Sequence, residues 1–298
     1  MPFATVRTGM TLSYEVRGEG EPLLLVMGLG RQFVSWPDAF VDGLVERGFK
    51  VILFDNRDIG LSTKGTMKPP SILRSIAGAL SRRFVQHEYL LSDMADDAAG
   101  LLEALEIERA HIVGVSMGGM ITQQLAIAHP NRVRSITSIM STTGDRRVGR
   151  PKTSISLKLG RLSRGGRETY VDREVEIFRL ISGSSYDEAA LRALAVRELA
   201  RDYSPEGMAR QLAAIVASPD RTPLLRTLNV PTLVVHGLED TLVAPSGGLN
   251  TVKAIPGARL LAFADMGHNL PGHRIPEILD AIVENTHRAA ARTPAPVG

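Results

Sequence analysis

Short runs of apolar residues alternate along the chain with longer segments of helical period. The runs are rich in Val, Ile and Leu and lie at 22–28, 49–55, 109–116, 133–141, 231–237 and 258–265. Continuous apolar runs of this length are typical of strands that are buried on both faces of a sheet. Their alternation with helical segments predicts a mostly parallel sheet with helices on both sides.

Three segments place their apolar residues on one helical face, at 94–105, 121–128 and 275–282. We expect Ser92 to cap the first of these helices, because a serine hydroxyl accepts a free N–H of the first turn. Pro130 is expected to end the second helix.

The two ends and the middle of the chain depart from this alternation. Residues 5–26 predict an antiparallel hairpin that leads into the first parallel strand. Residues 145–222 hold helix-like segments and no convincing strand, which predicts a helical insertion long enough to form a cap. The core would then consist of 1–144 and 223–290, and 291–298 is expected to be a disordered tail.

The segment "GVSMGG" lies where a predicted strand meets a predicted helix. A serine on so sharp a turn has a strained backbone, and its side chain projects above the sheet. Gly114 and Gly118, two positions away from Ser116 on either side, are expected to leave room for the turn. The N–H of Met117 would lie at the positive end of the helix, where it can hold a developing oxyanion. We therefore interpret Ser116 as a nucleophile.

A serine hydroxyl needs a base, and the base needs an orienting acid. Among seven histidines, His268 lies on the loop just beyond the last predicted strand. In the loop beyond the preceding strand, Asp240 is the favoured acid, with Glu239 and the more distant Asp145 as alternatives. Open α/β sheets build their sites beyond the carboxyl ends of the strands, so Ser116, Asp240 and His268 are expected to meet there.

A second oxyanion donor is expected at the end of the first parallel strand. There "VMGLG" places Gly28 and Gly30 around Leu29, so that the main chain can approach a substrate closely. We assign the oxyanion donors to the backbone N–H groups of Leu29 and Met117.

Four segments together resemble the α/β-hydrolase fold family: "VMGLG", "FDNRDIGLST", "GVSMGGMITQQLA" and "DMGHNLP". The resemblance extends over residues ~3–288, and within the family it is to aclacinomycin methylesterase-like and mycobacterial LipG-like carboxylesterases. It implies a mostly parallel eight-stranded sheet flanked by helices, with a helical cap inserted before the strand that precedes Asp240. It also implies a Ser-His-Asp hydrolase with no cofactor and no metal. Many members carry His at the position of Met27 and Gly at that of Asp58.

These observations predict an enzyme that cleaves carboxylic esters through an acyl-enzyme. A thioesterase or a lipid-acyl hydrolase is the nearest alternative, and a carbon–carbon bond hydrolase uses the same triad. A non-catalytic binding protein would keep the fold and lose the triad, whereas all three triad residues are present. The sequence leaves the acyl and alcohol parts of the substrate, the choice between ester and thioester, and the oligomeric state open.

Composition narrows the list of partners. A formal net charge of +3 is too small to imply a nucleic-acid partner, and the absence of cysteine excludes disulfides. Segment 146–167 carries eight Lys or Arg and no acid. It is interpreted as a solvated face, with attraction to an anionic substrate or peripheral contact with a membrane as the alternative. No signal peptide or membrane-spanning run is evident, so a cytoplasmic location is expected.

Overall fold

The computed structural model describes residues 1–69, 85–162 and 165–291. Its strands form an eight-stranded sheet in the order β1-β2-β4-β3-β5-β6-β7-β8. The strands are β1 (Phe3–Thr5), β2 (Thr11–Arg17), β3 (Glu21–Val26), β4 (Phe49–Phe54), β5 (Ala110–Val115), β6 (Val133–Ile139), β7 (Thr232–Gly237) and β8 (Arg259–Phe263). The pairs β1–β2 and β2–β4 are antiparallel, and the other pairs are parallel. The prediction of a mostly parallel eight-stranded sheet is confirmed.

The six apolar runs coincide with β3 to β8, but β8 differs from the others in burial. In β3, Leu24 and Val26 face one apolar cluster while Leu23 and Leu25 face another, which explains the unbroken apolar run. β8 lies at the edge of the sheet and leaves most of its residues at least partly exposed. The expectation of burial on both faces is wrong for β8, because the flanking helices pack mainly over the centre of the sheet. The predicted hairpin is present as β1 and β2.

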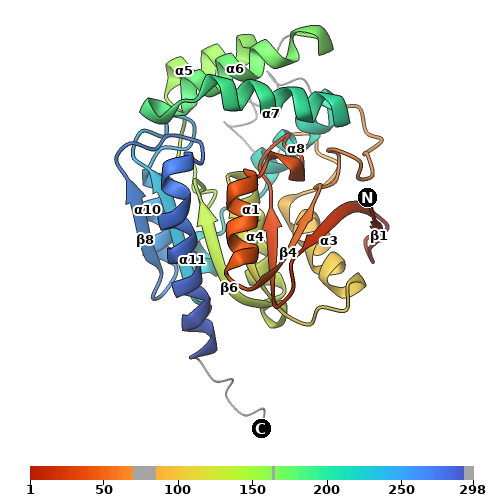
Figure 1. The fold of residues 1–298 in the computed structure, drawn as a ribbon. Coiled ribbons are helices and arrows are strands. Elements are labelled where there is room, and N and C mark those ends of the chain that lie inside the picture. The colour runs from red at the N-terminus through yellow and green to blue at the C-terminus, as the bar shows by residue number, and fades with distance from the viewer. Residues whose placement is uncertain (70–84, 163–164, 292–298) are drawn as a thin grey trace.

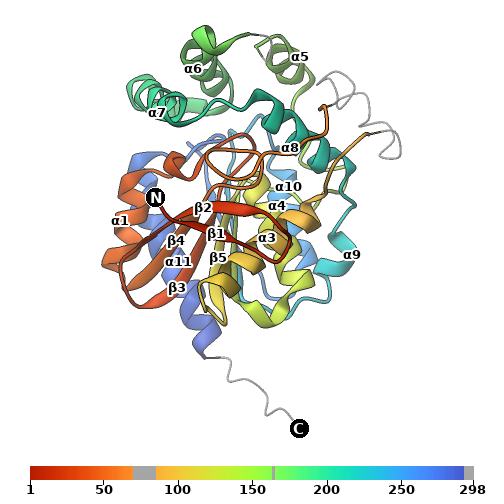
Figure 2. The same cartoon turned by 90° about the vertical axis from the view of Figure 1, so that its right-hand side faces the viewer.

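Helices cover both faces of the sheet, as Figure 1 and Figure 2 show. One face carries α1 (Asp38–Glu46) and α11 (Ile275–Ala290), and the other carries α3 (Leu91–Ala104), α4 (Met117–Ala128), α9 (Thr222–Leu225) and α10 (Ser246–Ala254). Short 3-10 helices lie at Phe33–Ser35, Pro130–Arg132, Arg167–Thr169, Gly183–Ser185 and Gly272–Arg274. Each apolar cluster is therefore closed by helices on one side and by the sheet on the other.

The N-terminus of α3 is capped differently from the prediction. The helix begins at Leu91, so Ser92 is already inside its first turn. The side chain of Asp93 accepts the N–H of Leu90 at 2.7 Å, and the hydroxyl of Ser218 accepts the N–H of Leu91 at 2.9 Å. The prediction of a Ser92 cap is wrong, because a hydroxyl from a distant part of the chain takes its place.

Between β6 and β7 the chain forms α5 (Thr153–Leu162), α6 (Tyr170–Ile181), α7 (Glu188–Arg201) and α8 (Pro205–Ala217). These four helices, called the cap helices below, lie together at one end of the sheet (Figure 1, Figure 2). Within the described part of 145–222 there is no strand. Residues 292–298 of the expected tail lie outside the described residues. Among the described helices, none has the length and apolar character needed to cross a membrane.

Candidate active site

Ser116 occupies a sharp turn between β5 and α4. Its φ of 56° and ψ of −118° lie in a region that residues with a side chain rarely adopt. The Ser116 N–H donates to the carbonyl of Ile139 at 2.8 Å, and the Ser141 hydroxyl donates to the carbonyl of Ser116, also at 2.8 Å. Strained main chain persists where surrounding bonds fix it in this way. The turn therefore holds the Ser116 side chain in one position.

Two glycines give this turn its clearance. A Cβ on Gly114 would lie 2.2 Å from the carbonyl oxygen of Gly118, and a Cβ on Gly118 would lie 2.0 Å from that of Val26. Both distances are far below van der Waals contact. Any larger residue at either position would push β3, β5 and the start of α4 apart.

The structure brings Ser116, His268 and Asp240 together beyond the carboxyl ends of β5, β8 and β7. His268 Nε2 lies 3.0 Å from Ser116 Oγ, and His268 Nδ1 lies 2.7 Å from Asp240 Oδ2. The other carboxylate oxygen of Asp240 accepts the N–H groups of Leu242 and Val243 at 2.9 and 2.8 Å. The carboxylate of Asp240 therefore accepts a hydrogen bond from the Nδ1–H group, and this tautomer leaves the Nε2 lone pair facing the serine hydroxyl.

The cap helices contact the loop that carries His268. The His268 N–H donates to the carbonyl of Ile181, the last residue of α6, at 2.7 Å. A Cβ on Gly267 would lie 2.3 Å from the main chain of Ser182. Asp240 thus holds the imidazole, and the main chain at the end of α6 holds the loop that carries it.

The two alternative acids lie elsewhere. Glu239 accepts the N–H and the hydroxyl of Ser184, which lowers the pKa of its carboxyl. Asp145 pairs with Arg147 at 2.9 Å. The carboxylate bonded to His268 Nδ1 is that of Asp240.

A second histidine lies beside Asp240. His236 Nε2 donates to the carbonyl of Val243 at 2.9 Å and is 3.7 Å from Asp240 Oδ2. Burial lowers the pKa of His236, which favours the neutral ring. His236 lies near the end of β7 and is buried.

The loop after β3 approaches the nucleophile. A Cβ on Gly28 would lie 3.2 Å from Ser116 Cβ. Met117 is the first residue of α4, where N–H groups have no partner within the helix. Leu29 follows Gly28 and Met117 follows Ser116, so the backbone amides of both residues belong to the segments that meet at the nucleophile.

Sequence reasoning missed the side chains that hold this loop. Asn56 Nδ2 donates to the carbonyl of Met27 at 2.9 Å, and the N–H of Gly30 donates to Gln211 Oε1 at 2.9 Å. Gln211 belongs to α8, 181 residues further along the chain, so no local pattern could have indicated it. Asn56 lies two residues beyond the end of β4, in the segment "FDNRDIG".

Buried ion pairs connect the same loop to the cap helices. Arg31 lies 2.6 Å from Glu174 of α6 and 3.0 Å from Glu198 of α7. Asp55 accepts the N–H of Phe33 and pairs with Arg201 of α7 at 2.6 Å. Burial raises the pKa of Glu174, and the guanidinium of Arg31 opposes that rise.

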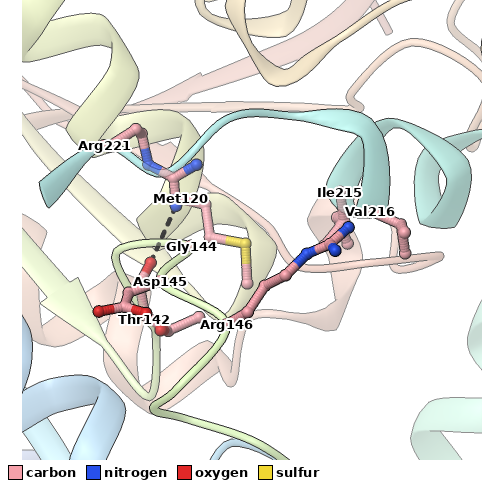
Figure 3. A pocket seen from close by; sticks show the side chains of 8 residues that line it. All are labelled: Met120, Thr142, Gly144, Asp145, Arg146, Ile215, Val216 and Arg221. Atoms are coloured by element: carbon pink, nitrogen blue, oxygen red, sulfur yellow. Dashed lines mark hydrogen bonds between the residues drawn. The ribbon is translucent and has the colours of Figure 1, made fainter. Parts of the chain in front are cut away.

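A cavity of about 170 Å³ opens beside the first turn of α4. Met120 of α4 lines it together with Ile215 and Val216 of α8, and Arg146 reaches across it toward these two residues (Figure 3). Thr142, Gly144, Asp145 and Arg221 complete the lining. The N–H of Met120 donates to the carbonyl of Ser116 at 3.3 Å, so the cavity begins one helical turn from the nucleophile.

Metal chemistry has no evident ligands in the described residues. No group of three or more His, Cys, Asp or Glu side chains that could hold a metal ion occurs among residues 1–69, 85–162 and 165–291.

Comparison with known proteins gives relatives of several activities. A rhodomycin D methylesterase, DauP, from Streptomyces sp. (strain C5) is 28% identical over 273 residues, covering 84% of this chain and 85% of that protein. A 2-hydroxy-6-oxononadienedioate/2-hydroxy-6-oxononatrienedioate hydrolase from Paraburkholderia xenovorans (strain LB400) is 29% identical over 276 residues, covering 89% and 88%.

The solved structures include an esterase, EaEST, from Exiguobacterium antarcticum. It matches 96% of this chain and 98% of its own with a TM-score of 0.75, at 18% sequence identity, which is evidence for a shared fold alone. A family model described as "alpha/beta hydrolase fold" matches residues 21–271, most of the chain. The chain belongs to the alpha/beta hydrolase fold family.

Proposed function

We propose that this protein is a serine hydrolase that cleaves carboxylic esters through an acyl-enzyme. The observation that supports it best is the unbroken series of contacts from Ser116 Oγ through His268 to Asp240, at 3.0 and 2.7 Å. Nucleophile, base and orienting acid are each within hydrogen-bond reach of the next, which is the geometry that nucleophilic catalysis by serine requires.

The proposed reaction has two halves. His268 Nε2 takes the proton of Ser116 as Oγ attacks the ester carbonyl, and the resulting oxyanion accepts the N–H groups of Leu29 and Met117. The imidazolium, stabilised by Asp240, gives its proton to the leaving alcohol. Water activated by His268 then attacks the acyl-enzyme and releases the acid.

The cavity beside Met120 indicates what such an ester carries. Its volume of about 170 Å³ is close to that of a protein cavity of about 150 Å³ that holds benzene. The apolar lining from Met120, Ile215 and Val216 suits a compact apolar group. We propose that this group occupies the cavity while the cap helices cover the rest of the substrate. The relative named a methylesterase favours esters of small alcohols as first substrates.

Carbon–carbon bond hydrolysis is the second candidate. The relative from Paraburkholderia acts, by its name, on a keto-dioate, and hydrolysis of such a compound breaks a carbon–carbon bond because it holds no ester. A carboxylated substrate needs a cation, and Arg146 at the cavity is the residue that favours this candidate.

A matched set of substrates tests the proposal. Purified protein is assayed with p-nitrophenyl esters from acetate to octanoate, aromatic methyl esters, acyl-CoA thioesters and a 2-hydroxy-6-oxo-dienoate. We expect the highest kcat/KM with an ester, and an acyl adduct on Ser116 by intact-mass measurement. Ser116→Ala should abolish both that activity and labelling by a fluorophosphonate.

The control is Ser154→Ala, at an exposed serine of α5, which should behave as the wild type. Ester hydrolysis that survives in Ser116→Ala would refute the proposal. Preference for the dienoate or for the thioesters would keep the triad and replace the substrate class.

A further inference from the structure

The loop after β3, residues 27–33, is called the oxyanion loop below. It contacts two residues on one face of α8. Gly30 has a φ of +70°, which favours glycine, and a Cβ there would lie 2.8 Å from Met208 Cγ. The N–H of Gly30 donates to Gln211 Oε1 at 2.9 Å. Met208 and Gln211 are three residues apart and therefore face the same way. The cap thus contacts the loop two residues beyond Gly28, which packs on Ser116.

Gln211 is fully buried, and both ends of its amide are used. Its Oε1 accepts the Gly30 N–H, and its Nε2 donates to the carbonyl of Arg57 at 2.8 Å. The neighbouring Asn56 donates to the carbonyl of Met27 at 2.9 Å. Two consecutive residues therefore hold the oxyanion loop at both ends. Asn56 holds it directly at Met27, and the carbonyl of Arg57 holds it through Gln211 at Gly30.

This arrangement selects which amide can face the oxyanion. Gly30 gives its N–H to Gln211, so that donor points away from the substrate. The carbonyl of Met27 is held by Asn56, which fixes the peptide at the other end. Leu29 lies between the two fixed points, so the orientation of its N–H depends on both of them.

We propose that Gln211 is a positioning residue, which sets the orientation of the Leu29 N–H from the cap. The inference rests on the proposed function, because it assigns Gln211 to the oxyanion hole of that reaction. A donor acts on a transition state only when it is aimed at the place where charge develops. Without Gln211, the partly buried Gly30 N–H loses its acceptor, and we expect the loop to rotate toward another one.

Gln211→Met keeps the size of the side chain and removes both hydrogen bonds. We expect kcat to fall about 10- to 100-fold with KM unchanged, less than the 10²–10³ that a lost oxyanion donor costs. Affinity for a trifluoromethyl ketone, which forms a tetrahedral adduct, should fall by the same factor. Affinity for a substrate analogue that stays planar should not change.

Gln211→Glu supplies a readout that a structural role alone does not move. A buried carboxyl group has a raised pKa, and in its neutral form it accepts the Gly30 N–H and donates to the Arg57 carbonyl. The ratio of its kcat to that of the wild type should therefore rise as the pH falls. For Gln211→Met the same ratio should stay flat.

The control is Asn285→Leu, which removes a buried amide that donates to Ile136 at 3.0 Å, far from the site. It should lose comparable stability with unchanged kcat. Wild-type kcat in Gln211→Met, or a pH ratio for Gln211→Glu that does not rise, would overturn the inference. Hydrogen exchange of the Gly30 N–H, measured in Ser116→Ala, separates the two proposals. If adding Gln211→Met removes the protection of the Gly30 N–H from exchange, the hydrogen bond between Gly30 and Gln211 is supported whether or not the protein cleaves esters.

Discussion

The two flanks of the candidate site are held by different kinds of interaction. The oxyanion flank, residues 27–33, is fixed by buried polar and charged side chains from the cap helices. Arg31 reaches both Glu174 and Glu198, and Gln211 accepts the Gly30 N–H. Each of these contacts is made by a side chain and is lost if that side chain is replaced.

On the base flank, residues 238–243 and 264–270, the triad residues are held mainly by main-chain groups. His268 is held by the carbonyl of Ile181, and Asp240 by the amides of Leu242 and Val243. Main-chain groups remain when side chains change. The comparison teaches that stability and catalysis should be separable on the base flank and coupled on the oxyanion flank.

Asp240→Asn is expected to have the largest effect on catalysis and a small one on stability. The amide group facing His268 Nδ1 forces the wrong tautomer, and kcat should fall about 10³- to 10⁴-fold. The remaining oxygen still accepts the N–H groups of Leu242 and Val243, so the free energy of unfolding should change by less than about 1 kcal/mol. Steady-state kinetics and urea unfolding measure the two effects.

Glu239→Gln is the matched control for Asp240→Asn, because Glu239 is the adjacent carboxylate and is bonded to Ser184. It should keep wild-type kcat. A large loss of stability in Asp240→Asn would mean that the base flank is coupled to the fold in the same way as the oxyanion flank.

Glu198→Ala should reduce stability and catalysis together. Glu198 is 1% exposed and contacts Arg31, Ser35 and Tyr170. Breaking a buried pair from one side costs about 3–5 kcal/mol. We expect the lower end of that range, because Arg31 keeps Glu174. Urea unfolding gives the loss of stability, and kcat should fall because the oxyanion loop loses a support.

Glu188→Ala is the control for Glu198→Ala, since Glu188 is an exposed acid of α7 that pairs with Arg179. It should change the free energy of unfolding by less than about 0.5 kcal/mol. If Glu198→Ala does not fold, Glu198→Gln, which keeps the volume of the side chain, is measured in its place. Loss of stability with unchanged kcat would contradict the coupling on the oxyanion flank.

The two flanks also differ in how far the sequence predicts them. Ser116, Asp240 and His268 each follow a strand, so the carboxyl edge of a parallel sheet places them together without further information. The sheet itself follows from the apolar runs. For these features, local pattern and topology are sufficient.

Gln211 and Glu198 carry no such signal. Gln211 lies 181 residues from its partner Gly30, and Glu198 lies at a similar separation from its partner Arg31. Both pairings depend on how the cap helices pack. The N-terminus of α3 differs from its prediction for the same reason, because the hydroxyl of Ser218, at the end of α8, accepts an N–H there. Contacts between the core and the inserted helices are decided by tertiary packing, which no local pattern records.

A pH titration of stability tests whether His236, beside Asp240 on the base flank, is neutral in the fold. Burial lowers the pKa of His236 in the fold, whereas in the unfolded chain it is about 6.5. Below that pH the unfolded state binds a proton that the folded state does not, so stability falls as the pH falls. Each such histidine lowers the free energy of unfolding by up to about 1.4 kcal/mol for every unit by which the pH falls.

His236→Gln keeps a donor for the carbonyl of Val243 and does not titrate. Its free energy of unfolding between pH 7 and pH 5 should therefore fall less steeply than that of the wild type. Some slope should remain, because burial also lowers the pKa of His111. Equal slopes for variant and wild type would mean that His236 is protonated in the fold and acts on Asp240 as a charge.

The smallest effects are expected on the outer side of the cap, which belongs to neither flank. Lys158 and Arg161 are exposed on α5, a helix in which Ile155 is the buried residue. Replacing both with Gln should change the free energy of unfolding by less than about 0.5 kcal/mol. The cap contacts described above for residues 27–33 and the His268 loop come from α6, α7 and α8, so kcat/KM for a neutral ester should stay within about twofold of the wild type. A larger loss, measured at both low and high salt, would show that the cap acts on the site as one body, and the separation of the flanks would then fail.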